Sequence, residues 1–124
     1  MSFNTNLLKN RAIININDEA FGVTFTHWTR KRRTWSFRWQ DVIAIEAVMV
    51  AIPLNGDQFR FLIQGVGDKR NFISDDMENW SALEDMIRKR FPDFNWANVD
   101  AAKVYANMDK RFSCWKRENA TQGK

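Results

Sequence analysis

The hydrophobic pattern of this chain changes its period once along its length, after Ser74. Before that residue, apolar side chains alternate with polar ones, as in Phe21, Val23 and Phe25, and this alternation is typical of half-buried β-strands. After it, apolar residues recur at the three- and four-residue spacing of an amphipathic helix: Met77, Trp80, Leu83, Ile87 and Phe91. Strands followed by helices predict an α+β fold.

Turn residues divide the first part of the chain into about six strands. The polar segment 17–19 predicts a hairpin between two alternating runs, and segments 55–57 and 65–68 predict two more turns. Residues 42–50 are apolar on both faces, which is typical of a strand buried on both sides. We therefore expect about six to seven strands in an antiparallel sheet that is curled, folded into two layers or closed into a small barrel, with a helix over an open end or face.

Two helices are expected after these strands. Asp75 and Glu78 have the spacing of a capping box at a helix start. The basic residues at 88–90 and the proline at position 92 mark the helix end, so a capping helix is predicted over 75–91. Asn95 is a suitable N-cap for a second helix that runs to about Met108. A short extended or packed tail is expected after it.

The length of 124 residues suits one domain. Ten Phe, six Trp and one Tyr predict a core rich in aromatic side chains. The predicted single domain, 1–124, has four parts: an N-terminal segment 1–10, antiparallel strands 11–74, the capping helix 75–91, and the second helix with a packed tail 95–117.

Charge is distributed unevenly along the chain, whose formal net charge is +4. The basic residues at 30–33 and Arg38 are interleaved with aromatic residues and have no acid among them, whereas 75–85 is acidic. Cations beside aromatic side chains are typical of surfaces that bind phosphates or acidic partners. The predicted binding residues lie in the hairpin 28–39: Trp28, Arg30, Lys31, Arg32, Arg33 and Arg38.

A structural interpretation of the same hairpin stays open. Trp35, Phe37 and Trp39 alternate on one face and are more economically placed in the core. Cations at an exposed hairpin tip also keep it soluble and block pairing of its edge with other strands. The hairpin is thus either a binding surface or a solvated loop.

Side chains suited to catalysis are few. The chain has one cysteine, Cys114, and one histidine, His27, so an internal disulfide is excluded and a Cys/His zinc site is not expected. The acids Asp75, Asp76 and Glu78 are explained by helix capping, and a glycine-rich phosphate loop is absent from the sequence. We expect a protein without enzymatic activity, metal or cofactor.

The first residues lack the apolar core of a signal peptide. The most apolar run, 42–54, is too short to span a bilayer and contains Glu46. The prediction is a cytoplasmic protein with no transmembrane segment.

The Trp and aliphatic pattern of 39–47, the segment 57–61, the helix that ends at Phe91 and the tail 112–117 together resemble a compact bacterial pleckstrin-homology-like domain. Proteins of similar layout occur among the immunity and accessory proteins of bacterial toxin systems. The resemblance implies a curled sheet of seven strands capped by a helix. In lipid-binding members a basic loop between strands binds phosphoinositide headgroups, and 30–33 invites that comparison.

Three classes of function follow from these observations. The first is a non-enzymatic protein-binding module, such as a bacterial immunity or adaptor protein, with another protein as its partner. The second is binding of a nucleic acid or an anionic surface through the basic hairpin 28–39. The third is an enzyme, which the scarcity of titratable side chains makes the weakest of the three.

Overall fold

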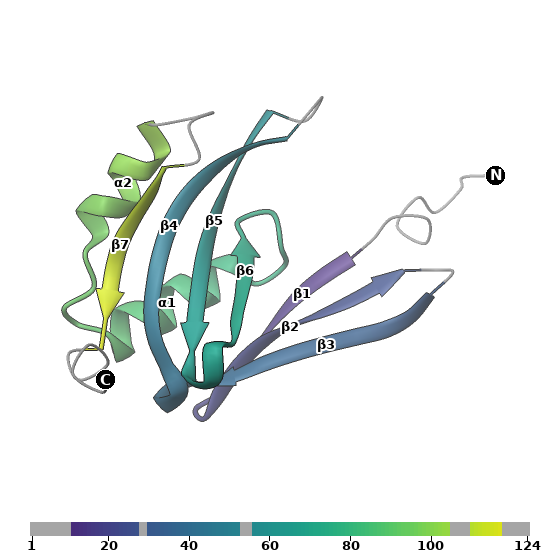
Figure 1. Cartoon of the computed structure of the whole chain (residues 1–124). Coiled ribbons are helices and arrows are strands. Elements are labelled where there is room, and N and C mark those ends of the chain that lie inside the picture. Colours follow the sequence, from purple (N-terminus) through teal and green to yellow (C-terminus); the bar gives the residue numbers. More distant parts are fainter. Residues whose placement is uncertain (1–10, 28–29, 53–55, 105–109, 118–124) are drawn as a thin grey trace.

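A computed structural model describes residues 11–27, 30–52, 56–104 and 110–117. These residues form an α+β fold of two antiparallel sheets and two α-helices (Figure 1). The first sheet has the strand order β1-β2-β3 and the second the order β6-β5-β4-β7. The strands are β1 (Arg11–Ile16), β2 (Ala20–His27), β3 (Arg30–Arg38), β4 (Val42–Ile52), β5 (Gly56–Gly65), β6 (Arg70–Ser74) and β7 (Arg111–Lys116). The helices are α1 (Trp80–Arg90) and α2 (Trp96–Val104), with short 3-10 turns η2 (Trp39–Asp41) and η3 (Val66–Asp68).

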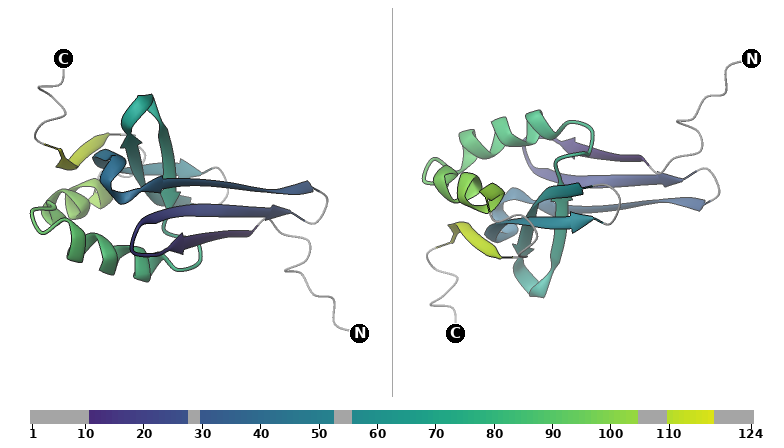
Figure 2. Two further views of the ribbon diagram at one scale, coloured as in Figure 1. Left: turned by 90° about the horizontal axis from the view of Figure 1, so that it is seen from below. Right: turned by 90° about the horizontal axis from the view of Figure 1, so that it is seen from above.

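The three-stranded sheet is built from local hairpins. At the turn between β1 and β2, Asn17 Oδ1 accepts 2.8 Å hydrogen bonds from the backbone N–H groups of Glu19 and Ala20, which confirms the predicted turn. Phe21 lies opposite Phe37 in β3, and both side chains are buried. Figure 2 shows this sheet extending to one side, beyond the helices and the four-stranded sheet.

The four-stranded sheet has β4 at its centre. Ile45 and Ala47 are buried on the face that meets the core, and Val48 is buried on the opposite face, which confirms the prediction for this strand. The predicted tail is extended, as β7, and pairs with β4 so that Phe112 lies opposite Ala47. With this strand the described residues contain seven strands, the upper end of the predicted number.

The core lies between the two sheets and the helices, which cover one face of the four-stranded sheet (Figure 1). Leu83 and Ile87 are the buried face of α1, and Trp80 stacks on Phe61 with ring centres 5.1 Å apart. Phe91, just after the helix, is 7% exposed. The predicted apolar helix face is therefore confirmed for Leu83, Ile87 and half-buried Trp80, whereas Met77 precedes the helix.

The predicted start of the first helix at Asp75 is wrong, because α1 begins at Trp80. Glu78 cannot join the helix, since its backbone is bonded to β1: the Ile14 N–H donates to the Glu78 carbonyl at 3.0 Å, and the Glu78 N–H donates to the Ala12 carbonyl at 3.1 Å. The capping box is consequently absent. Asn79 precedes the helix in the left-handed conformation, with φ of 73°.

The second helix has the predicted cap. Asn95 Oδ1 accepts a 3.1 Å hydrogen bond from the backbone N–H of Asn98, three residues along the chain. Val99 and Ala102 face the core, and α2 packs against β4 and β7. The predicted continuation to Met108 lies outside the described residues, as do the segments 1–10 and 118–124.

The alternative of a small closed barrel is wrong. Across the described strands, β3 and β6 do not pair, so the two sheets stay separate on that side. The two sheets are in close contact at one corner, where a Cβ on Gly65 would lie 2.5 Å from the Phe37 ring. At that corner the Lys69 side chain donates to the Ser36 carbonyl of β3, in place of a strand-to-strand ladder.

Candidate binding surface

The three-stranded sheet carries only one sign of charge. Its strands contain no Asp or Glu. They contain six basic residues: Arg11, Arg30, Lys31, Arg32, Arg33 and Arg38. Of these, Arg11 is paired with Glu78 at 2.5 Å. The acids nearest in sequence, Asp18 and Glu19, lie in the turn between β1 and β2.

Three of the predicted binding residues, Lys31, Arg32 and Arg33, are exposed at the start of β3. Within the described part of the chain none of the three makes an ion pair or a hydrogen bond through its side chain. Trp28 and the side chain of Arg30 lie outside the described residues. The side chains of Lys31, Arg32 and Arg33 are thus solvated cations.

The strand does not present its cations as one cluster. Arg33 lies opposite Phe25, on the face that also holds Trp35, and the register shifts between Phe25 and His27. Arg38 lies at the other end of β3, opposite Ala20. Arg33 and Arg38 are five steps apart along an extended strand, which is about 17 Å. The structure therefore separates Arg38 from the rest of the predicted site.

The aromatic residues of β3 and η2 belong mostly to the core, as predicted. Phe37 and Trp39 are 2% and 5% exposed, and Trp39 packs on Phe21 with ring centres 4.3 Å apart. Trp35 is half-buried and meets the edge of the Phe37 ring. A row of exposed rings on which bases could stack is therefore not formed by these three side chains.

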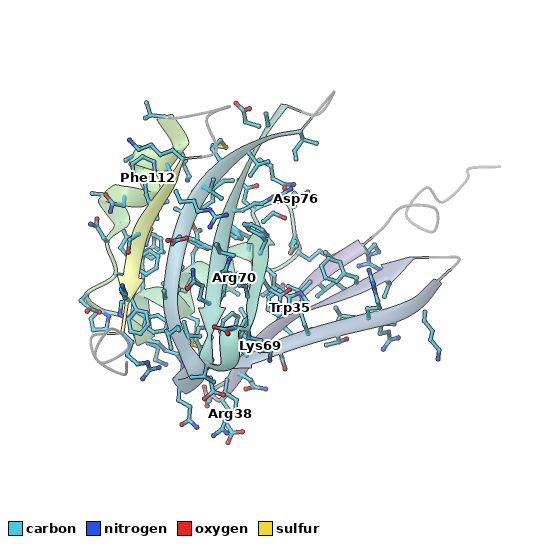
Figure 3. The ribbon with its side chains drawn as sticks, viewed as in Figure 1. Trp35, Arg38, Lys69, Arg70, Asp76 and Phe112 are labelled. Atoms are coloured by element: carbon cyan, nitrogen blue, oxygen red, sulfur yellow. The ribbon has the colours of Figure 1, made fainter. Side chains whose placement is uncertain are left out.

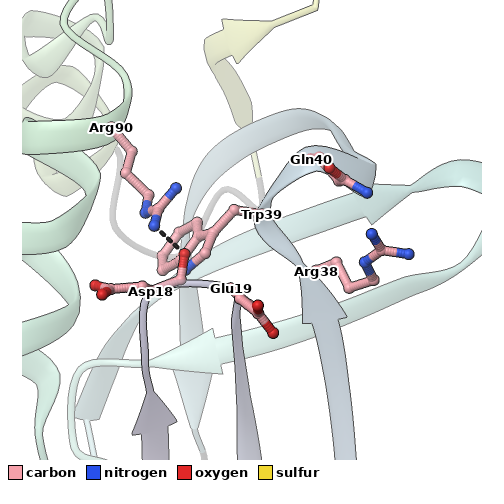
Figure 4. Close-up of a pocket in the computed structure, with 6 residues that line it drawn as sticks. All are labelled: Asp18, Glu19, Arg38, Trp39, Gln40 and Arg90. Carbon is pink, nitrogen blue, oxygen red and sulfur yellow. Dashed lines mark hydrogen bonds between the residues drawn. The ribbon is translucent and has the colours of Figure 1, made fainter.

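Arg38 lines a pocket of about 310 Å³ together with residues of the β1–β2 turn, of η2 and of the end of α1 (Figure 4). The guanidinium of Arg90, at the end of α1, lies 5.1 Å from the centre of the Trp39 ring and donates to the Asp18 carbonyl. Trp39 Nε1 donates to the Asn17 carbonyl at 2.9 Å. The lining residues are Asp18, Glu19, Arg38, Trp39, Gln40 and Arg90. No local sequence signal relates a helix end to a hairpin turn, so this pocket could not be found from the sequence.

The charges of this pocket balance. Two guanidinium groups, those of Arg38 and Arg90, face two carboxylates, those of Asp18 and Glu19. A free anion would be attracted by the first pair and repelled by the second. The pocket therefore favours neither anions nor cations, unlike the three-stranded sheet.

The outer face of the four-stranded sheet is a second exposed surface. Phe72 on β6 is 40% exposed, and the Arg60 guanidinium lies 5.5 Å from the centre of its ring. Glu46 and Arg111 approach to 3.8 Å, yet Glu46 Oε1 is buried without a hydrogen-bond partner among the described residues. No pattern in the sequence points to a function for these residues.

The residues considered for catalysis are placed differently. Cys114 is buried on the core side of β7, and burial raises the pKa of its thiol to about 12. The side chain of His27 lies outside the described residues. In the described ranges no group of three or more His, Cys, Asp or Glu side chains is arranged to hold a metal ion.

The fold is thus an α+β arrangement with one acid-free, basic sheet. No known family model, curated protein or solved structure matches the chain. The resemblance to pleckstrin-homology-like domains accordingly stays a prediction. Neither described helix is long and apolar enough to cross a membrane.

Proposed function

We propose that this protein is a non-enzymatic protein-binding module that recognises an acidic partner through its three-stranded sheet. The observation that supports the proposal most is the charge of that sheet: its strands hold six basic residues and no acid, and Lys31, Arg32 and Arg33 are exposed. Keeping like charges together on one sheet costs electrostatic energy unless a partner of opposite charge offsets it.

The distribution of aromatic side chains favours a protein partner over a nucleic acid. Single-stranded nucleic acids are held by cations together with exposed rings on which bases stack. Phe37 and Trp39 are in the core, and only half-buried Trp35 remains partly open on β3. Arginine, by contrast, is enriched among the residues that dominate protein–protein binding.

A cytoplasmic immunity or adaptor protein of bacterial origin is the narrower form of this proposal. Its support is the resemblance in layout to such proteins. The basic sheet adds one requirement, that the partner surface be acidic, because complementary potentials both accelerate association and exclude wrong partners.

A displayed library of random peptides tests the proposal. The immobilised protein is expected to enrich peptides rich in Asp and Glu. Lys31→Ala/Arg32→Ala should abolish this enrichment. The matched control, Lys89→Ala/Lys116→Ala, removes the same charge from exposed residues of α1 and β7 and should retain it. Equal loss in both variants would show that only net charge matters, which contradicts a site on the sheet.

The nucleic-acid alternative is tested by titrating a random single-stranded DNA pool against salt. Four phosphate contacts would give a slope of log affinity against log salt of roughly −3. We expect no measurable binding to the pool at low salt. A steep slope that flattens in Lys31→Ala/Arg32→Ala would replace the protein partner by a nucleic acid.

A further inference from the structure

The outer edge of β3 has no paired strand among the described residues, so its backbone N–H and carbonyl groups are open to a partner. We propose that an extended, acidic segment of the partner protein binds along this edge as an added β-strand. This inference rests on the proposed function. Backbone hydrogen bonds to the edge of β3 would hold the added segment, and the cations of β3 would make binding specific for acidic segments.

The two outer edges of the three-stranded sheet differ. The edge of β1 is closed, because Ala12 and Ile14 exchange backbone hydrogen bonds with Glu78. On the outer side of β3, no strand pairs within the described residues. The described residues thus close the edge of β1 and leave the edge of β3 without a paired strand.

The direction of the backbone groups on β3 follows from two bonds. The Ser36 carbonyl accepts a bond from Lys69, which is not part of this sheet, whereas the Trp39 N–H donates to the Glu19 carbonyl on the β2 side. The backbone groups of successive residues in a strand point to opposite sides, and those of every second residue point to the same side. Thr34, two residues before Ser36, therefore presents its N–H and carbonyl to the free edge.

Charge decides which strand can be added. Basic residues on an edge strand repel a second copy of the same strand, which is how natural sheets avoid pairing with one another. Arg32 and Arg38 alternate with Trp35 along β3, so they lie on the opposite face and would attract a strand that carries its acids on that face. The ammonium group of Lys69, which Figure 3 shows at the end of the four-stranded sheet near β3, adds to this attraction. The same side chains thus exclude self-association and favour an acidic segment.

Half-buried Trp35 adds a contact for uncharged side chains. It lies on the face of β3 that turns toward the core, and its ring packs against Phe37. In an added strand, every second side chain would lie on that face. An alternation of acidic and β-branched residues is therefore the sequence pattern that fits the edge.

The test uses a fluorescein-labelled peptide of eight alternating Glu and Val residues, with binding followed by fluorescence anisotropy. Two further peptides carry N-methyl groups on the Glu amides or on the Val amides. An added strand donates to β3 through only one alternate set of its amides. One methylated peptide should therefore bind at least tenfold more weakly, and the other should bind nearly as well as the parent.

Variants of β3 give an independent readout. Thr34→Pro removes the N–H that points to the free edge and should weaken binding of the parent peptide at least tenfold. Thr34→Ala keeps that N–H and should leave binding within twofold. Circular dichroism and the melting temperature check that both variants fold. If Thr34→Pro does not fold, the methylated peptides decide, because they use the unaltered protein.

The outcomes separate this inference from the proposed function. Equal binding of both methylated peptides would overturn strand addition, while enrichment of acidic peptides from the library would still support an acidic protein partner. A dimer that Thr34→Pro dissociates would overturn the inference as well, since a second copy of the chain would then occupy the edge. Absence of any peptide binding at low salt would also reject strand addition.

Discussion

Lys69 Nζ donates a 2.5 Å hydrogen bond to the backbone carbonyl of Ser36, and this bond joins the corner of the four-stranded sheet to the edge strand of the three-stranded one. The same ammonium group lies 4.8 Å from the centre of the Phe37 ring. Lys69→Met keeps the apolar stem but removes both interactions. Because the site is exposed, we expect a loss of about 0.5–1.5 kcal/mol in the free energy of unfolding, measured with urea. An unchanged midpoint would show that the bond does not stabilise the corner.

Phe91 and Phe72 provide a matched pair of aromatic truncations. Phe91 is 7% exposed and packs between Trp39 and Trp115, whereas Phe72 is 40% exposed. Phe91→Ala should cost about 3–5 kcal/mol of unfolding free energy, and Phe72→Ala less than about 1 kcal/mol. Urea denaturation of both variants measures the difference. Similar midpoints would contradict the packing of the segment that follows α1.

Asn79 makes two separable contributions before α1. Its backbone is left-handed, with φ of 73°, and its Nδ2 donates to the Ile14 carbonyl at 2.9 Å. Both Asn79→Gly and Asn79→Ala lose this hydrogen bond. Glycine also removes the Cβ, which disfavours the left-handed conformation by about 1–2 kcal/mol, whereas alanine keeps it. The alanine variant should therefore be the less stable in thermal denaturation. The reverse order would argue against the left-handed conformation.

Cys114 should be unreactive in the folded protein. Its thiol is buried, and burial raises the pKa to about 12, so that at pH 8 about one molecule in ten thousand carries the reactive thiolate. We expect no reaction at pH 8 with an aromatic disulfide reagent that releases a yellow product, until urea unfolds the chain. Rapid modification without urea would place the thiol on the surface.

The pKa of Asp75 should lie above the ordinary value of an aspartate. Partial burial raises its pKa, the neighbouring Asp76 raises it further, and Lys103 lowers it. Asp76→Asn should therefore lower the pKa of Asp75, and Lys103→Gln should raise it, as followed by NMR titration of the carboxyl carbon.

The pH dependence has a definite sign. Because the folded state holds this proton more tightly than the unfolded state, ionisation of Asp75 opposes folding. Its contribution is absent below about pH 3.8 and lowers stability as the pH rises above that value. Asp75→Asn should then raise the urea midpoint at pH 7 and leave it unchanged at strongly acidic pH. A lower midpoint at pH 7 would contradict the raised pKa.

The sequence pattern by itself determined those strands, turns and helix faces that depend on residues close together in the chain. The alternation of Phe21, Val23 and Phe25 gives a strand, Asn17 forms the turn before it, and the spacing of Leu83 and Ile87 gives the buried face of α1. Each depends on side chains within a few positions of one another. The basic, acid-free composition of the three-stranded sheet is likewise present in the sequence. Which residues belong to that sheet follows from the bounds of its strands in the structure.

Contacts between distant segments decided the rest. Glu78 is kept out of α1 by its backbone bonds to β1, and Arg38 is separated from Arg33 by an extended strand and placed beside Arg90 of a helix. A hydrophobic period records that one face of an element is buried but not which element covers it. Strand partners, free edges and pockets depend on that choice, so the open edge of β3 became visible only in the tertiary structure.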